Sequence, residues 1–236
     1  MLSYDRHSWG DGVDFKKRLA DLILYLDQYL DEITPKTILE IGPGPGWLSM
    51  CLQTKFPNSK MILVEPSEDV ALLAKQNLPF ATVVPSDLDD IKMRDGLIDL
   101  AVVCGVDYLF NNFKGAFDKI YSLLSKDGYI YIERNVFVEA EAYSWYPINS
   151  YHNLFGQNAL MTTWFNKEQY LELLKMYFDV VSVRSYLLNE THGHKCIIEG
   201  YWCKKKNKVY DYYNENRSWF SVNMKSLDRL SKGEFQ

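Results

Sequence analysis

Long apolar runs are missing from this sequence of 236 residues. No stretch is long enough to span a lipid bilayer, and the opening MLSYDRHSWGDG lacks the apolar segment of a secretion signal. Cysteine is scarce as well, with four residues and no CxxC pair. These absences argue against a membrane protein and against a disulfide scaffold. They predict reduced, buried thiols in a cytoplasmic protein that has no membrane partner.

Positive charge is also in short supply. The chain has 26 Lys and Arg residues against 31 Asp and Glu residues, which gives a net charge of -5. Nucleic-acid binding needs a basic face, so we expect no nucleic-acid partner. The one basic run, KKKNK at 204–208, predicts a solvated linker, with a surface contact as the alternative.

What the sequence does contain is a regular alternation of apolar strands and helical patterns. Hydrophobic residues make up 47% of the chain, enough for a sizeable core in one domain. The predicted strands are 37–41, 60–65, 81–84, 97–104 and 129–133, and the predicted helices are 14–33, 47–56, 67–77 and 113–124. Continuously apolar strands separated by helices predict a buried parallel sheet with helices on both faces.

The alternation breaks after residue 133. Residues 134–165 have no clean period and are rich in aromatic side chains. A helix then begins near Asn166, and two strands, 179–186 and 195–202, flank the turn NETHGH. We therefore expect an α/β, Rossmann-like, doubly wound sheet of seven strands, mostly parallel with an antiparallel last strand. This domain would cover 1–203, with a C-terminal extension over 204–236.

The segment TILEIGPGPGWLSM, residues 37–50, carries the strongest local signal. A strand, a glycine-rich turn and a helix start together form a nucleotide or anion site, because glycines let a ligand approach the backbone. The dinucleotide fingerprint GxGxxG fails here, because its sixth position is Trp47. Each loop proline also removes a backbone N–H that a pyrophosphate would need. The loop therefore predicts a less negatively charged ligand, such as a nucleoside with a zwitterionic tail.

Two acids follow at the ends of the next strands. Glu65 ends the second strand, about 20 residues past the loop, where a carboxylate can accept hydrogen bonds from both ribose hydroxyls. Asp87 follows the third strand, where an acid can accept a hydrogen bond from an adenine amino group. Both positions are consistent with an adenosine-containing ligand.

This ordered set resembles the class I S-adenosylmethionine-dependent methyltransferases. The resemblance is carried by ILEIGPGPG, LVEP, SDLDDI, LIDLAVVCGVDYLF, LLSKDGYIYIE and FNKEQYLELLKMYFDVVSV, and it covers roughly 14–202. It implies S-adenosylmethionine as the cofactor and S-adenosylhomocysteine as the product. The cofactor-binding residues that it implies are Glu40, Gly42, Pro43, Gly44, Gly46, Glu65, Pro66, Asp87, Leu88, Cys104 and Gly105.

The resemblance also implies a role for each part of this set. Glu40 and the glycine-loop backbone would face the methionine portion, Glu65 the ribose, and Asp87 with the next backbone amide the adenine. Cys104 and Gly105 would lie near the reacting methyl group. We interpret Cys104 as a wall of the site, because no neighbouring base could activate its thiol.

The aromatic segment 134–165 lies where this architecture builds a cover over the acceptor. The acceptor-pocket residues that we predict are Tyr143, Trp145, Tyr146 and Trp164, with Tyr108 at the floor. Such walls suit a flat organic metabolite, or an amine through cation–π contact. His152 is the candidate general base, because its pKa suits proton removal near neutrality. The alternative is an aromatic mini-core under a long loop, and we expect no metal site.

Three functions remain open on the sequence. The first is a methyltransferase acting on a small organic metabolite. The second is an NAD(P)-dependent oxidoreductase, against which Trp47 and the loop prolines count. The third is a non-catalytic S-adenosylmethionine-binding or interaction protein, for which the aromatic segment 210–220, YDYYNENRSWF, gives some grounds. The same segment could form a homodimer contact.

Overall fold

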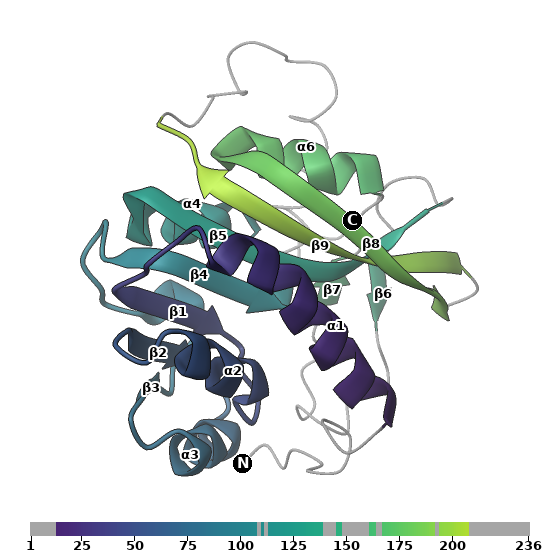
Figure 1. The fold of residues 1–236 in the computed structure, drawn as a ribbon. Coiled ribbons are helices and arrows are strands. Elements are labelled where there is room, and N and C mark those ends of the chain that lie inside the picture. Colours follow the sequence, from purple (N-terminus) through teal and green to yellow (C-terminus); the bar gives the residue numbers. More distant parts are fainter. Residues whose placement is uncertain are drawn as a thin grey trace.

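A computed structural model describes residues 13–107, 110, 113–138, 145–147, 161–163, 167–191 and 194–207. Within these residues, seven strands form one sheet in the order β3-β2-β1-β4-β5-β9-β8 (Figure 1). The strands are β1 Thr37–Ile41, β2 Lys60–Val64, β3 Thr82–Val84, β4 Ile98–Cys104, β5 Leu124–Phe137, β8 Phe178–Thr191 and β9 His194–Lys205.

The pairing of these strands confirms the predicted fold class. From β3 to β5 every neighbouring pair is parallel. The last strand, β9, is antiparallel to both of its neighbours, β5 and β8. The carboxyl ends of β1, β2, β3, β4 and β5 therefore meet at one edge, where ligands bind in open α/β sheets.

Helices cover both faces of the sheet, as predicted. The helices α1 Val13–Leu30, α2 Trp47–Lys55 and α3 Glu68–Asn77 pack on one face, and α4 Phe113–Leu123 and α6 Lys167–Tyr177 pack on the other. Successive strand residues point to opposite faces of the sheet. Ile38 therefore packs in the core under α1, α2 and α3, and Leu39 packs in the core under α4 and α6. The 3-10 turn η1, Leu88–Asp90, packs on the same face as α4 and α6.

The first helix covers the antiparallel end of the sheet (Figure 1). Tyr25 Oη donates a hydrogen bond of 3.1 Å to Ser182 Oγ on β8, and the guanidinium of Arg184 lies 5.3 Å from the centre of the Tyr25 ring. Tyr29 stacks on Trp202 of β9, with 5.5 Å between the ring centroids. These contacts explain the amphipathic pattern of α1.

The strand β5 is longer than predicted. It runs from Leu124 to Phe137, so the start of the expected 134–165 insertion belongs to the sheet. The cause is non-local, because β9 pairs with residues 129–137 and holds them extended. Gly128, between the predicted helix 113–124 and the predicted strand 129–133, lies within β5 where the β4–β5 register shifts. Farther along, β6 Trp145–Pro147 and β7 Met161–Thr163 form a two-stranded antiparallel sheet, which the irregular pattern did not predict.

Two further local predictions need correction. Ser67, the first residue of the predicted helix 67–77, lies just outside α3 at its N-cap position, and its side chain makes no capping hydrogen bond. Its backbone N–H instead donates to the carboxylate of Glu65. Among the described cysteines, Cys203 is buried, whereas Cys51 and Cys104 are half-buried because they lie near the ends of their elements. All three are free thiols.

No helix in the described part of the chain combines the length and the apolar character needed to cross a membrane. The cytoplasmic location stays a prediction.

Candidate functional site

The glycine loop connects β1 to α2 at the carboxyl edge of the sheet. Gly42, Gly44 and Gly46 have φ values of 65°, 54° and 88°, a left-handed conformation that favours glycine. A Cβ on Gly42 would lie 2.6 Å from Val106, and one on Gly46 would lie 2.2 Å from Leu78. A Cβ on Gly44 would meet no atom within 4 Å. The outer glycines therefore allow close packing, and the middle one borders open space.

The backbone donors of this loop are all used inside the protein. The N–H of Gly42 donates to Val64 O over 2.8 Å, and that of Gly46 donates to the carbonyl of the first loop proline over 3.0 Å. The N–H of Gly44 donates to the Glu65 carboxylate. The two prolines have no N–H. Residues 42–46 thus offer no backbone donor to a pyrophosphate, in agreement with the expectation from the sequence.

Glu65, the residue after β2, turns its carboxylate toward the loop. Its side chain accepts hydrogen bonds from the N–H groups of Ser67, at 3.1 Å, and Gly44. Burial raises the pKa of Glu65, the two hydrogen bonds lower it, and the charge of Asp87 raises it further. A carboxylate can accept about four hydrogen bonds, so two N–H donors leave capacity for two hydroxyls.

Glu40 lies within β1, beneath the loop, on the face covered by α2. It is buried, and it accepts a hydrogen bond from Ser49 Oγ of that helix. Burial raises the pKa of Glu40 from 4.5 to about 7, although the Ser49 bond works in the opposite direction. Glu40 can therefore gain or lose its charge near neutrality.

The remaining predicted cofactor residues lie at the ends of β2, β3 and β4. Pro66 and Asp87 are exposed, and the side chain of Leu88 is buried in the core. Burial raises the pKa of Asp87, and its neighbours Asp89 and Asp90 raise it further. Cys104 ends β4, and Gly105 follows it with a φ of 64°. Glu65 and Asp87 are close enough for their charges to interact. The topology thus gathers the predicted residues along one sheet edge, and their roles stay predictions.

The predicted acceptor site cannot be placed in the same way. Tyr108, Tyr143, His152 and Trp164 lie outside the described residues, as do the segments 1–12 and 208–236. Trp145 and Tyr146 belong to β6, which pairs with β7, and only their backbone is described. The pocket and the general base stay predictions.

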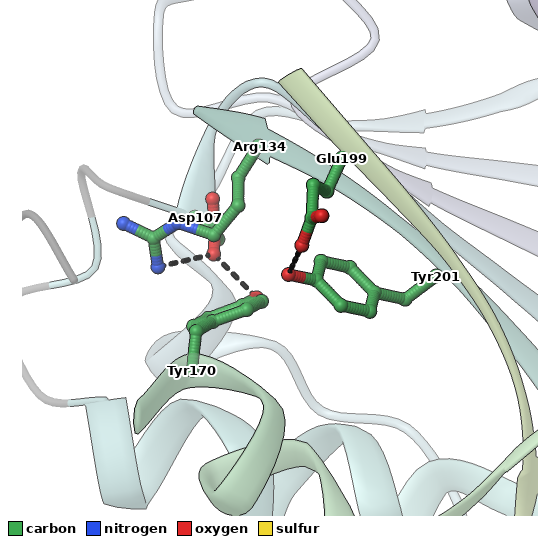
Figure 2. Close-up of polar contacts among 5 residues, drawn as sticks. All are labelled: Asp107, Arg134, Tyr170, Glu199 and Tyr201. Atoms are coloured by element: carbon green, nitrogen blue, oxygen red, sulfur yellow. Dashed lines mark hydrogen bonds and ion pairs between the residues drawn. The ribbon is translucent and has the colours of Figure 1, made fainter. Parts of the chain in front are cut away.

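Sequence reasoning missed a set of buried polar residues near the ends of β4 and β5. We call Asp107, Arg134, Tyr170, Glu199 and Tyr201 the buried polar cluster (Figure 2). They come from β5, β9, α6 and the turn after β4. The only local signal for them is a charge at the end of an apolar run, as in YIYIER and CIIEGYW.

A comparison with known proteins identifies the fold and its cofactor. The family profile described as "Methyltransferase domain" matches residues 13–183. The chain belongs to this methyltransferase family. The match spans all the strands that carry the candidate cofactor residues. It confirms the resemblance to the class I S-adenosylmethionine-dependent methyltransferases and, with it, S-adenosylmethionine as the cofactor.

Two curated relatives of this methyltransferase are malonyl-[acyl-carrier protein] O-methyltransferases. The protein from Geobacter sulfurreducens is 28% identical over 116 residues, which are 48% of this chain and 43% of the relative. The protein from Bacillus cereus is 23% identical over 181 residues, 74% of this chain and 65% of the relative. The chain thus spans less than two thirds of either relative's length.

Solved structures of other methyltransferases share the fold. One is the 1,6-didemethyltoxoflavin-N1-methyltransferase of Burkholderia thailandensis, solved with bound 1,6-didemethyltoxoflavin and S-adenosylhomocysteine. Its TM-score is 0.61 at 17% identity, and the match covers 85% of this chain and 82% of that one. The N-methyltransferase NodS of Bradyrhizobium japonicum WM9, with S-adenosylhomocysteine, has a TM-score of 0.59 at 15% identity over 85% and 93%. At these identities the likeness shows the fold.

The residues of the methyltransferase site fit its cofactor. The glycine loop has room at Gly44 and offers no donor for a pyrophosphate, which is compatible with a nucleoside that carries no phosphate. Acids at Glu40, Glu65 and Asp87 suit a ligand that carries a sulfonium and an ammonium group. When bound, S-adenosylmethionine supplies an electrophilic methyl group.

A pair of glycine substitutions tests whether the open space at Gly44 belongs to the cofactor. Gly44 and Gly96 have φ values of 54° and 70°, and a Cβ on either would meet no atom within 4 Å. Both Ala substitutions should therefore cost a similar backbone strain of about 1 kcal/mol. We expect Gly44→Ala to weaken S-adenosylhomocysteine binding about tenfold in calorimetry, and Gly96→Ala to leave it within about twofold. Equal affinities for the two variants would remove Gly44 from the site.

Proposed function

We propose that this protein transfers the methyl group of S-adenosylmethionine to a nucleophilic atom of a small organic acceptor. The bond between sulfur and the methyl carbon breaks as the acceptor lone pair forms a new bond to that carbon. The sulfonium becomes the neutral thioether of S-adenosylhomocysteine, and a protonated acceptor loses its proton to a base or to water. His152 is the proposed base, with the aromatic residues Tyr108, Tyr143, Trp145, Tyr146 and Trp164 around the acceptor.

The observation that carries the proposal is the arrangement of Gly44 and Glu65. An open approach to the backbone lies beside a carboxylate whose two N–H partners leave acceptor capacity for two hydroxyls. A ribose placed there would align the rest of the cofactor with the carboxyl ends of β4 and β5. Such alignment can lower the barrier of a displacement by about 7–11 kcal/mol, so the protein itself needs little further chemistry.

Two classes of acceptor have support. A flat heterocycle or an amine suits the aromatic composition of 134–165, and both solved neighbours named above are N-methyltransferases. A carrier-linked acyl group is the second candidate, because both curated relatives are named for one. We favour the small metabolite because aromatic walls recognise a ring or a cation, whereas a malonyl carboxylate calls for a basic group.

Calorimetry with S-adenosylhomocysteine and with NAD+ tests the cofactor half of the proposal. We expect saturable binding of S-adenosylhomocysteine and none of NAD+, because the loop leaves no backbone donor for a pyrophosphate. The reverse result would contradict the proposal and restore the oxidoreductase alternative.

Release of S-adenosylhomocysteine in the presence of candidate acceptors tests the other half. One set contains small amines, phenols and nitrogen heterocycles, and a second contains malonyl-pantetheine as a carrier mimic. Turnover with the first set alone supports the proposal, and turnover with malonyl-pantetheine alone supports the second candidate. Cofactor binding without turnover in either set would favour the non-catalytic alternative.

A further inference from the structure

The turn that follows β4 connects the cofactor loop to the interior of the opposite face. We call residues 105–107 the post-β4 turn. The N–H of Gly105 donates to Glu133 O of β5 over 2.7 Å. Val106 packs so closely on Gly42 that a Cβ there would lie 2.6 Å from its side chain. The third residue of the turn, Asp107, is fully buried.

Asp107 enters the buried polar cluster, where two side chains hold one of its oxygens (Figure 2). Arg134 Nη1 lies 2.9 Å from Asp107 Oδ2, and the side chains of both residues are 0% exposed. The hydroxyl of Tyr170, on α6, donates to the same oxygen over 2.7 Å. The Arg134 guanidinium also lies 4.2 Å from the centre of the Tyr170 ring. Asp107 is thus held from β5 and from α6 together.

The other half of the cluster is arranged around a second buried carboxylate, and it shares α6 with the first half. Glu199 of β9 is also fully buried. It accepts hydrogen bonds from the hydroxyl of Tyr201 and, over 2.6 Å, from Ser185 Oγ of β8. Lys167 Nζ of α6 lies 2.6 Å from the same carboxylate. This half therefore joins β8, β9 and α6, and its Tyr201 ring lies 5.4 Å from the Tyr170 ring, centroid to centroid.

A buried ion pair is a poor device for stability alone, because desolvation of the two charges offsets most of their attraction. A buried ion pair can, however, fix the positions of the two residues that form it. Asp107 must stay where Arg134 and Tyr170 can compensate it, since a displaced buried carboxylate would lose both partners. The position of Asp107 in turn limits where Val106 can lie against the glycine loop.

We propose that Tyr170 and Arg134 are positioning residues for the cofactor site, acting through Asp107 and Val106 on the glycine loop. The inference rests on the proposed function, because it assigns the cofactor to that loop. Through this chain of contacts, cofactor affinity depends on α6, a helix on the face of the sheet opposite α2. The chain returns to α6 directly after the predicted acceptor cover, so α6 links the cover to the cofactor loop.

Two matched tyrosine substitutions test the proposal in the full chain. Tyr170→Phe and Tyr201→Phe each remove one hydroxyl that donates to a buried carboxylate, and both rings keep their volume. We expect both variants to lose a similar amount of thermal stability. Tyr170→Phe should weaken S-adenosylhomocysteine binding about five- to tenfold in calorimetry, whereas Tyr201→Phe should stay within about twofold. Hydrogen exchange at the Gly105 amide, which donates to Glu133 O, should accelerate in Tyr170→Phe alone.

Each other result has a defined meaning. Equal losses of affinity in the two variants, or no loss and no faster Gly105 exchange in Tyr170→Phe, would overturn the positioning role. If Tyr170→Phe does not fold, Arg134→Lys serves in its place, because it keeps a positive charge beside Asp107 while removing the planar guanidinium that holds the carboxylate. If the wild-type chain does not bind S-adenosylhomocysteine, the proposed function fails and the role toward the cofactor fails with it. Exchange at Gly105 then tests only whether Tyr170 holds the post-β4 turn in place.

Discussion

Replacing Glu65 by alanine is expected to weaken S-adenosylhomocysteine binding about 100-fold. The carboxylate lies beside the open space at Gly44, and we propose that it accepts both ribose hydroxyls. Hydrogen bonds to a charged group are worth about 1.5–3 kcal/mol each, and a loss of about 2.7 kcal/mol corresponds to 100-fold in affinity. Isothermal titration calorimetry at constant pH and salt measures the change.

Two control variants separate the ribose contact from a general loss of charge. Glu68 is an exposed acid in the first turn of α3, close to Glu65 in sequence. We expect Glu68→Ala to change the affinity by less than about twofold, because surface charges contribute little. Glu65→Gln should fall between the two, since its amide oxygen can still accept from the Gly44 N–H. If Glu65→Ala bound as well as Glu68→Ala, the ribose assignment would be wrong.

The second large effect concerns stability and pH at Glu40. Burial raises the pKa of Glu40 from 4.5 in the unfolded chain to about 7 in the folded protein. Folding therefore takes up a proton between these values. The stabilising contribution of Glu40 is full below pH 4.5 and is lost as the pH rises through about 7. The difference in pKa corresponds to about 3 kcal/mol over this window.

Glu40→Gln should remove this pH dependence, because an amide does not titrate in this range. We expect the unfolding free energy of the variant, relative to wild type, to rise by about 3 kcal/mol between pH 4.5 and pH 8. Urea unfolding at several pH values measures it. Ser49→Ala removes the hydrogen bond that lowers the pKa of Glu40, so it should extend the loss of stability to higher pH and enlarge the total change. Parallel curves for wild type and Glu40→Gln would mean that the carboxylate is not buried as the structure shows.

Much of the fold could be predicted because its causes are local. The run TILEI is continuously apolar, and it forms β1 with the predicted bounds. The bounds of β2, β4 and α4 differ from prediction by one residue at an end. The glycine loop could be predicted equally well, because left-handed φ values and missing N–H groups are properties of glycine and proline themselves.

The candidate site could be predicted only in part. The place of Glu65 after β2 follows from its position in the chain, because parallel strands end at one sheet edge. Its contact with the Gly44 N–H does not, since that bond joins two loops whose separation depends on the packing of β1 against β2. The residues expected around the acceptor come from aromatic composition, which carries no positional signal.

The sequence by itself determined the alternation of strands and helices, the bare glycine loop and the choice of a phosphate-free nucleoside. These follow from periodicity and from backbone chemistry, which act over a few neighbouring residues. Only the tertiary structure decided that β9 extends β5, that Glu40 is buried against Ser49, and that Asp107 meets Arg134 and Tyr170. Burial of a charge and its compensation join residues far apart in the chain, and no local pattern records which partners will meet.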